Sequence, residues 1–192
     1  MRIQINIKYQ MKNVILIFTV LLGCLSSCSN VLFETSQPKD VNELEIIPKS
    51  LIGVYIGNND RDTLRIYDKS FHYSDKISNG FDINDTLKKN KVVLKPFKEY
   101  FILSLSDNHN HDSWTVFLVK QKENKLFLTS LSTETSNKDS IIKKLKEITN
   151  VKEAKNNNGK ADYIILNPTI DEFEKIIKSG LFTEVAEFTK IK

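Results

Sequence analysis

The stretch "EYFILSLSDNHNHDSWTVFLVKQKENKLFLTSL", residues 99–131, decides the fold of this chain. It contains three runs in which apolar residues alternate with other side chains, and this period of two is typical of β-strands. The residues that share one face are Phe101, Leu103 and Leu105 in the first run and Trp114, Val116 and Leu118 in the second. The turn "KEN" leads into the third run, so the stretch predicts an antiparallel β-meander.

Shorter runs of the same kind precede this stretch, separated by turn signals at the close spacing of an all-β unit. They cover residues 51–57, 63–67, 70–74, 81–83 and 91–95. The segment "NNDRDT", residues 58–63, has alternating oxygen side chains like those of a calcium loop. It lacks the glycine at the sixth position and the glutamate at the twelfth, so we interpret it as a turn.

After Ser132 the period of the apolar residues becomes helical. A first helix is expected over 136–148, with Ser136 and Asp139 marking its start. Its apolar residues form one stripe along a surface helix: Ile141, Ile142, Leu145 and Ile148. The run "DYIILN", residues 162–167, then predicts a strand.

A second helix is expected over 168–180. Thr169 and Glu172 have the spacing of a capping box, and Gly180 is a typical helix end. The apolar stripe consists of Phe173, Ile176 and Ile177. Residues 181–191 have the pattern of a last strand.

These patterns predict an α+β fold: an antiparallel β-meander or partly closed barrel, followed by two amphipathic helices with an intervening strand. We expect a single α+β domain over residues 50–192, β-rich over 50–132 and helix-containing over 136–192.

The first 27 residues have the features of an export signal. They carry Arg2, Lys8 and Lys12 but no acidic residue, and an apolar run over 14–25 follows. This run is shorter than the roughly 20 residues that a membrane-crossing helix needs, so we interpret 1–27 as a signal peptide. Met11 serves as a start site equally well, because Lys12 and the apolar run lie after it.

The only two cysteines of the chain, Cys24 and Cys28, follow this run. Leu25-Ser26-Ser27-Cys28 resembles the lipobox of bacterial lipoproteins, and Leu21-Leu22-Gly23-Cys24 is a second match with a bulky Leu22. The resemblance implies that Cys28, or Cys24 as second choice, is lipidated after cleavage. Residues 28–49 are then expected to be a lipidated N-terminal tether, although Val31–Phe33 and Ile46–Ile47 are apolar enough to pack onto the domain.

The balance of charges argues against a nucleic-acid-binding protein. The chain has 28 basic and 24 acidic residues, and removal of the signal takes away Arg2, Lys8 and Lys12. Nearly balanced charge does not give the concentrated basic face that such proteins show. Arg61 and Arg65 are the only arginines that remain, so the bidentate phosphate contacts that arginine makes are scarce.

One segment has the residue types of a metal site. His109 and His111 are two apart, with Asp107 before them, and alternate residues on a strand can grip one zinc or copper ion. The sequence supplies no third ligand at a defensible spacing. Because Asn, Asp and His also suit a hairpin loop, we prefer the loop interpretation.

No nucleotide-binding or serine-nucleophile motif occurs in the chain, so we expect neither a cofactor nor catalysis. The segment "LIGVY" resembles the first strand of lipocalin-type barrels, with Gly53 and Tyr55 where that family usually has Gly-x-Trp. We prefer the interpretation that Gly53 allows close strand packing and that Tyr55 belongs to the core. A ligand carrier of the lipocalin kind would need a pocket, for which the candidate residues are Tyr55, Phe101, Trp114 and Phe117.

The chain as a whole resembles small lipoproteins of Bacteroidota. The similar segments are the lipobox, "LFETSQP", "IPKSLIGVY" and "YIILNPTIDEFEKIIKSGLF". No acidic run follows Cys28, and in that group this implies an outer-membrane anchor that faces the periplasm.

The sequence therefore predicts a membrane-anchored lipoprotein of the cell envelope that acts as a non-catalytic interaction module with an envelope protein as its partner. The alternatives are a lipocalin-like carrier of a small ligand and, third, a metal-dependent hydrolase that uses His109 and His111.

Overall fold

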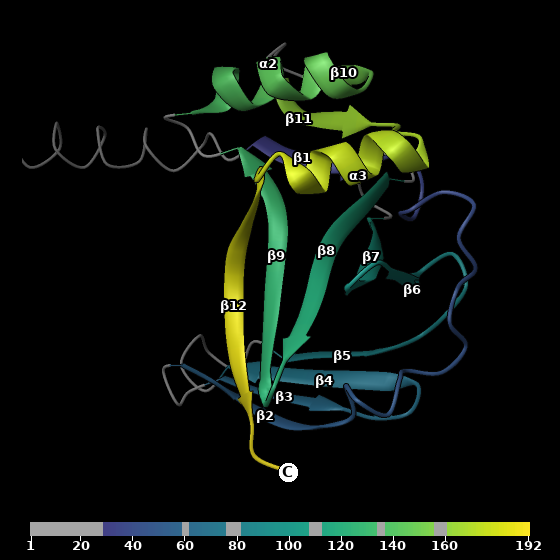
Figure 1. The fold of residues 1–192 in the computed structure, drawn as a ribbon, viewed down its shortest axis with the longest axis vertical. Helices are drawn as coiled ribbons and strands as arrows, with labels where there is room; N and C mark the ends of the chain where they lie inside the picture. Colours follow the sequence, from purple (N-terminus) through teal and green to yellow (C-terminus); the bar gives the residue numbers. More distant parts are fainter. Residues whose placement is uncertain (1–28, 59–61, 76–81, 108–112, 134–136, 156–160) are drawn as a thin grey trace, which may run out of the picture.

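The computed structural model describes residues 29–58, 62–75, 82–107, 113–133, 137–155 and 161–192. These residues form one mostly antiparallel sheet and two helices, α2 (Lys138–Ile148) and α3 (Ile170–Lys178) (Figure 1). The strands are β1 (Ser29–Phe33), β2 (Gly53–Gly57), β3 (Asp62–Ile66), β4 (Ser70–Asp75), β5 (Asp82–Thr86), β6 (Val92–Phe97), β7 (Tyr100–Asp107), β8 (Ser113–Lys122), β9 (Lys125–Thr133), β10 (Val151–Lys155), β11 (Ala161–Leu166) and β12 (Phe182–Lys190).

The sheet has the strand order β10-β11-β1-β8-β9-β12-β2-β3-β4-β5, and β6 and β7 extend it from β8 as a branch. Its end strands β10 and β5 are not neighbours, so the sheet of the described residues is open. The expected α+β class is confirmed in this coarse form, whereas the partly closed barrel is not found. A closed barrel requires the strands at the two ends of the sheet order to pair with each other, and β10 and β5 do not pair.

Two separate hydrophobic cores lie on opposite faces of the long central strands. The upper core packs α2 and α3 against the sheet and is centred on Phe33, Ile102, Leu145, Ile164 and Phe173. The lower core is centred on Tyr55, Leu64, Leu94, Leu126 and Phe188. Figure 1 shows why both exist: β9 and β12 run from the helices down to β2–β5, which lie across their lower ends.

The segment expected to be a tether contributes the strand β1. Val31, Leu32 and Phe33 are 4%, 2% and 0% exposed, and Val31 and Phe33 belong to the upper core. β1 pairs in parallel with β11, and on its other side it pairs antiparallel with β8 and β9. Within the expected tether 28–49, the apolar run Val31–Phe33 therefore packs onto the domain, as its sequence allowed, and it does so as a strand whose partner β11 lies far away in the sequence.

The helix signals of α3 are confirmed. Thr169 accepts a hydrogen bond from the backbone of Glu172, and the Glu172 side chain accepts one from the Thr169 backbone, which completes the capping box. Gly180 has a φ of 72°, a left-handed conformation that glycine adopts at little cost. Phe173 of the predicted stripe is fully buried and packs edge-on against Phe33 with 6.0 Å between ring centroids.

Strands near the end of the chain include one that the sequence did not predict. The last strand, expected over 181–191, is found as β12, and 162–167 is found as β11. The strand that was not predicted is β10, which follows α2 and pairs antiparallel with β11. Its sequence "VKEAK" carries little apolar alternation, and it forms because the edge of β11 offers it hydrogen bonds.

Gly53 and Tyr55 have the structural roles that were preferred for them. A Cβ added at Gly53 would lie 2.4 Å from the Lys192 backbone oxygen, so only glycine allows this close approach. Tyr55 is fully buried in the lower core, and its hydroxyl donates a hydrogen bond of 2.8 Å to the Leu51 oxygen.

Candidate functional site: an open apolar cavity

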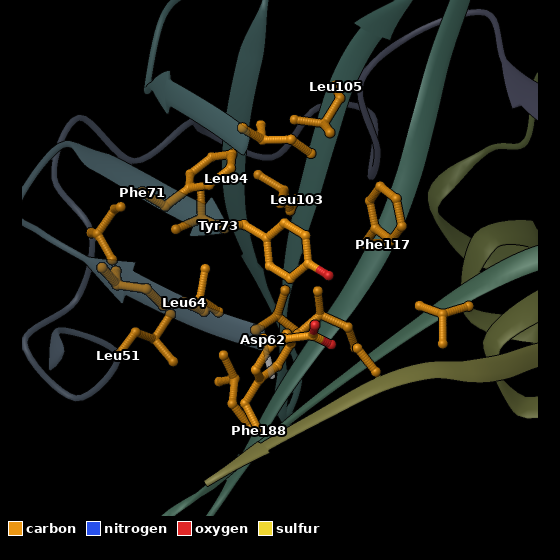
Figure 2. A pocket seen from close by; sticks show the side chains of 18 of the residues that line it. Leu51, Asp62, Leu64, Phe71, Tyr73, Leu94, Leu103, Leu105, Phe117 and Phe188 are labelled. Atoms are coloured by element: carbon orange, nitrogen blue, oxygen red, sulfur yellow. The ribbon is translucent and has the colours of Figure 1, made fainter. Parts of the chain in front are cut away.

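The lower core contains a cavity of about 290 Å³. It lies between the β2–β5 layer on one side and β7, β8, β9 and β12 on the other (Figure 2). Among the described residues that line it, every side chain is apolar except those of Asp62 and Tyr73. The cavity is therefore a hydrophobic chamber with one polar corner.

The period of two along the strands explains how the walls form. On β3 and β4, alternate residues Leu64, Ile66, Phe71 and Tyr73 point to the same side and line the cavity. The opposite wall uses the alternate positions of β7, β8 and β9 that face away from the helices. These residues are Leu103, Leu105, Phe117, Val119, Leu126 and Leu128.

A covering segment, residues 44–52, closes one side of the cavity with Ile47 and Leu51. It is held by backbone hydrogen bonds from Leu44 N to the Leu94 oxygen (2.8 Å) and from Ile47 N to the Asp68 oxygen (2.7 Å). Ile47 is 4% exposed whereas the adjacent Ile46 is 55% exposed. Part of the predicted tether is thus a wall of the cavity.

The cavity is open to solvent beside β12. The pairing of β12 with β9 shifts register between Glu184 and Ala186, so Val185 is the extra residue of a β-bulge. Bulges re-aim a side chain, and they are frequent next to functional sites. Val185 lines the cavity and is nevertheless 50% exposed, which places it at the mouth.

The polar corner is formed by Asp62 and Tyr73, whose side-chain oxygens lie among carbon-only side chains in Figure 2. The Tyr73 hydroxyl donates a hydrogen bond to the Asp62 carboxylate. Burial raises the pKa of Tyr73, and the charges of Asp62 and Asp75 raise it further. The Tyr73 ring also packs edge-on against Phe188, with 6.2 Å between centroids.

The pocket residues predicted from the sequence are only partly brought together. Phe117 lines the cavity. Trp114 packs against the upper core on the other face of the sheet, and Tyr55 and Phe101 belong to the lower core without lining the cavity. The sequence did not single out Asp62 and Tyr73, and Asp62 fell in the segment interpreted as a turn, whereas it begins β3.

The predicted metal ligands His109 and His111 lie outside the described residues, and so does the side chain of Asp107. Within the described ranges, no group of three or more His, Cys, Asp or Glu side chains could hold a metal ion. The arrangement that the structure does describe can enclose an apolar body beside one polar corner.

Cys24 and Cys28 also lie outside the described residues, so their lipidation stays a prediction. None of the helices in the described part of the chain is long and apolar enough to span a bilayer.

Comparisons with family models, with curated proteins and with solved structures find nothing that matches this chain.

Proposed function

We propose that the chain is a non-catalytic binding protein of the cell envelope that holds a small apolar molecule in the cavity of its lower core. The observation that carries the proposal is the open apolar cavity itself. Of the functions that the sequence suggested, this is the small-ligand carrier, built on an open sheet rather than on a barrel.

The size of the cavity supports binding. Protein interiors are close-packed, and voids larger than a water molecule are few and reduce stability. A void of about 290 Å³ is near the lower end of the roughly 300–1,000 Å³ that small-molecule sites enclose. An apolar ligand would fill this space and replace the missing packing contacts.

The exposure of the apolar lining gives independent support. Leu103, Leu105 and Phe117 are only half-buried although they belong to central strands, and Val185 is exposed at the mouth. Apolar surface that a fold leaves accessible in a concave site is typical of a binding site.

A lipid anchor at Cys28 would place this cavity at a membrane, where apolar molecules concentrate. Because β1 begins at Ser29, an acyl group on Cys28 would be attached directly before a strand, without a long spacer. The anchor, the periplasm-facing outer membrane and the envelope protein partner remain predictions from the sequence.

The anchor has its own test, since the two cysteines are matched controls for each other. We expect the Cys28→Ala chain to lose its acyl mass and the Cys24→Ala chain to keep it, as measured by intact mass spectrometry. A Cys28→Ala chain that still carried acyl mass at a processed N-terminus would refute lipidation at this residue.

The binding proposal is tested with the neutral fluorescent probe N-phenyl-1-naphthylamine. We expect saturable binding of one probe molecule per folded chain. Ala186 lines the cavity next to the bulge, so Ala186→Phe should fill the space and abolish the fluorescence increase. Thr183→Phe adds the same ring at an exposed position of β12 outside the cavity and should leave binding unchanged.

Absence of saturable binding to the unchanged chain would refute the proposal, as would equal binding to the Ala186→Phe and Thr183→Phe chains. Native mass spectrometry of the protein from its own membranes then identifies the occupant. A stoichiometric second protein with an empty cavity would favour the interaction module instead.

A further inference from the structure

We infer that the cavity takes medium-chain aliphatic molecules, with an apolar part of about ten carbon atoms, and that Ala186 sets this size limit. This inference rests on the proposed binding function and names the size class of its ligand and the residue that determines it.

The first step is the volume of the cavity, which is about 290 Å³. A methylene group occupies about as much space as a water molecule in the liquid, roughly 30 Å³, so about ten carbon atoms fill the cavity. One leaflet of a membrane contains about 15 Å of hydrocarbon, half of the bilayer core, and a phospholipid brings two chains of that length. The apolar part of a whole membrane lipid therefore exceeds the cavity, whereas a single medium chain fits.

The second step is the stiffness of the walls. Leu94, Leu126 and Phe188 line the cavity and are almost fully buried, because they also belong to the packed lower core. Ile47 and Leu51 of the covering segment are buried in the same way. Close-packed side chains cannot move apart without the loss of contacts elsewhere. The size limit is therefore a property of the fold and does not adapt to the ligand.

The third step is the one small apolar side chain of the lining. Among the described lining residues, every apolar side chain other than that of Ala186 is valine or larger. Ala186 directly follows the bulge residue Val185 and pairs with Leu128 of β9, which also lines the cavity. The space that a larger side chain would occupy at this position of β12 is thus left for the ligand.

The fourth step is the dependence of affinity on chain length. Each methylene group that leaves water for an apolar site tightens binding about fourfold. Carbon atoms beyond the capacity of the cavity stay in water at the mouth and add nothing. The chain length at which the affinity stops rising therefore measures the space inside.

The experiment is titration calorimetry of the protein with the linear alcohols from hexanol to dodecanol. These ligands carry no charge and differ only in length. For the unchanged protein we expect the affinity to rise about fourfold per carbon up to about ten carbons and to stay level beyond that length. An affinity that keeps rising through dodecanol would overturn the size limit.

Two changes should move the limit in opposite directions. Ala186→Leu places further carbon atoms in the cavity, so the affinity should stop rising at about seven carbons. Leu128→Ala removes as many, so the rise should continue through dodecanol. Thr183→Leu makes the matched addition at an exposed position of β12 outside the cavity and should leave the limit at about ten carbons.

Ala186→Val is the milder change at the same position and should lower the limit by about two carbons. It decides the role of Ala186 even if Ala186→Leu fails to fold. A limit that is the same in the Ala186→Val and Thr183→Leu chains would show that Ala186 does not set it.

The two proposals fail in different ways. N-phenyl-1-naphthylamine has a volume close to that of decanol, because its aromatic carbons carry few hydrogens, so it remains a probe of the same space. If neither the probe nor any alcohol binds the unchanged protein, the binding function itself is wrong. If they bind but the affinity for the alcohols rises without a limit, the size class is overturned and the carrier stands.

Discussion

Two tyrosines of the lower core show how position decides what the same side chain does. Tyr55 is fully buried, and its hydroxyl is used within the fold, on the Leu51 oxygen. Tyr73 stands on the cavity wall and holds Asp62. Burial raises the pKa of both hydroxyls above the ordinary 10.0, so both stay protonated further into alkaline pH than a solvent-exposed tyrosine does.

The role of Tyr55 can be tested by removal of one oxygen. In Tyr55→Phe the buried Leu51 oxygen loses its donor, so we expect the free energy of unfolding to fall by about 1–3 kcal/mol. Urea denaturation measures this loss. Tyr67→Phe, at an exposed position, is the control and should change stability by less than about 0.5 kcal/mol. Equal effects of the two changes would contradict a structural role for the Tyr55 hydroxyl.

For single residues, the sequence predicted which side chains share a buried face better than it predicted which side chains line the cavity. Alternation correctly grouped Trp114 with Val116 and Leu118 on one face of β8. Because a core lies on each face of this strand, alternation alone could not tell which face lines a cavity. Phe117 and Val119 on the other face do so.

Among the elements, β1 shows the limit of local patterns. Most strands and both described helices were predicted, because each has its own period of apolar residues and its own turn or capping residues at its ends. β1 and β10 were missed since both depend on β11, a partner that the local sequence does not reveal.

The place of β1 in the core predicts unequal effects of two changes within the segment expected to be a tether. Phe33 is fully buried, so Phe33→Ala should lower the free energy of unfolding by about 3–5 kcal/mol. Ile46→Ala, at a mostly exposed position, should change it by less than about 0.5 kcal/mol. Denaturant titration of both chains measures the difference, and a flexible tether would give two similarly small values.

The start of α3 predicts a dependence on pH. Glu172 accepts hydrogen bonds from Thr169 N (2.8 Å) and Thr149 Oγ1 (3.1 Å), and these bonds, together with the charge of Lys175, lower its pKa from the ordinary 4.5. A carboxylate with a lowered pKa in the folded state stabilises the fold above its unfolded pKa. This contribution is lost as the pH falls from 4.5 through the lowered value.

We therefore expect the unchanged chain to be more stable than Glu172→Gln at neutral pH and to lose this advantage in acid. Denaturation of both chains across this pH range measures the difference. Glu147→Gln, on the exposed face of α2, provides the reference for general acid effects. A Glu172→Gln difference that stayed constant with pH would show that the charge of Glu172 does not support the helix start.

In the whole molecule, the two cores share their long strands. β8 contributes Val116 and Leu118 to the upper core and Val119 to the lower one, and β12 contributes Phe188 to the lower core and Phe182 to the edge of the upper one. Neither core can lose its strands without exposing apolar surface of the other, so the described domain should unfold as one cooperative unit.

This coupling is measurable because Trp114, the only tryptophan, packs against the upper core. Its fluorescence reports the upper core, and release of N-phenyl-1-naphthylamine reports the lower core. With probe present throughout, we expect both signals to change at the same urea concentration. Midpoints that differ would show that the cores unfold independently. Far-UV circular dichroism of the same samples gives the transition of the sheet as a whole.

The pairing of β1 with β11 also orders events in time. A ribosome makes β1 before any of its partners. Asn30 is the register partner of Tyr163, so the two strands can pair only after Tyr163 has been synthesised. Contacts this distant in sequence form slowly, and unpaired apolar strands are prone to aggregate. The run Val31–Phe33 therefore needs shielding while the rest of the chain is made, and the upper core is completed only after β11 has arrived.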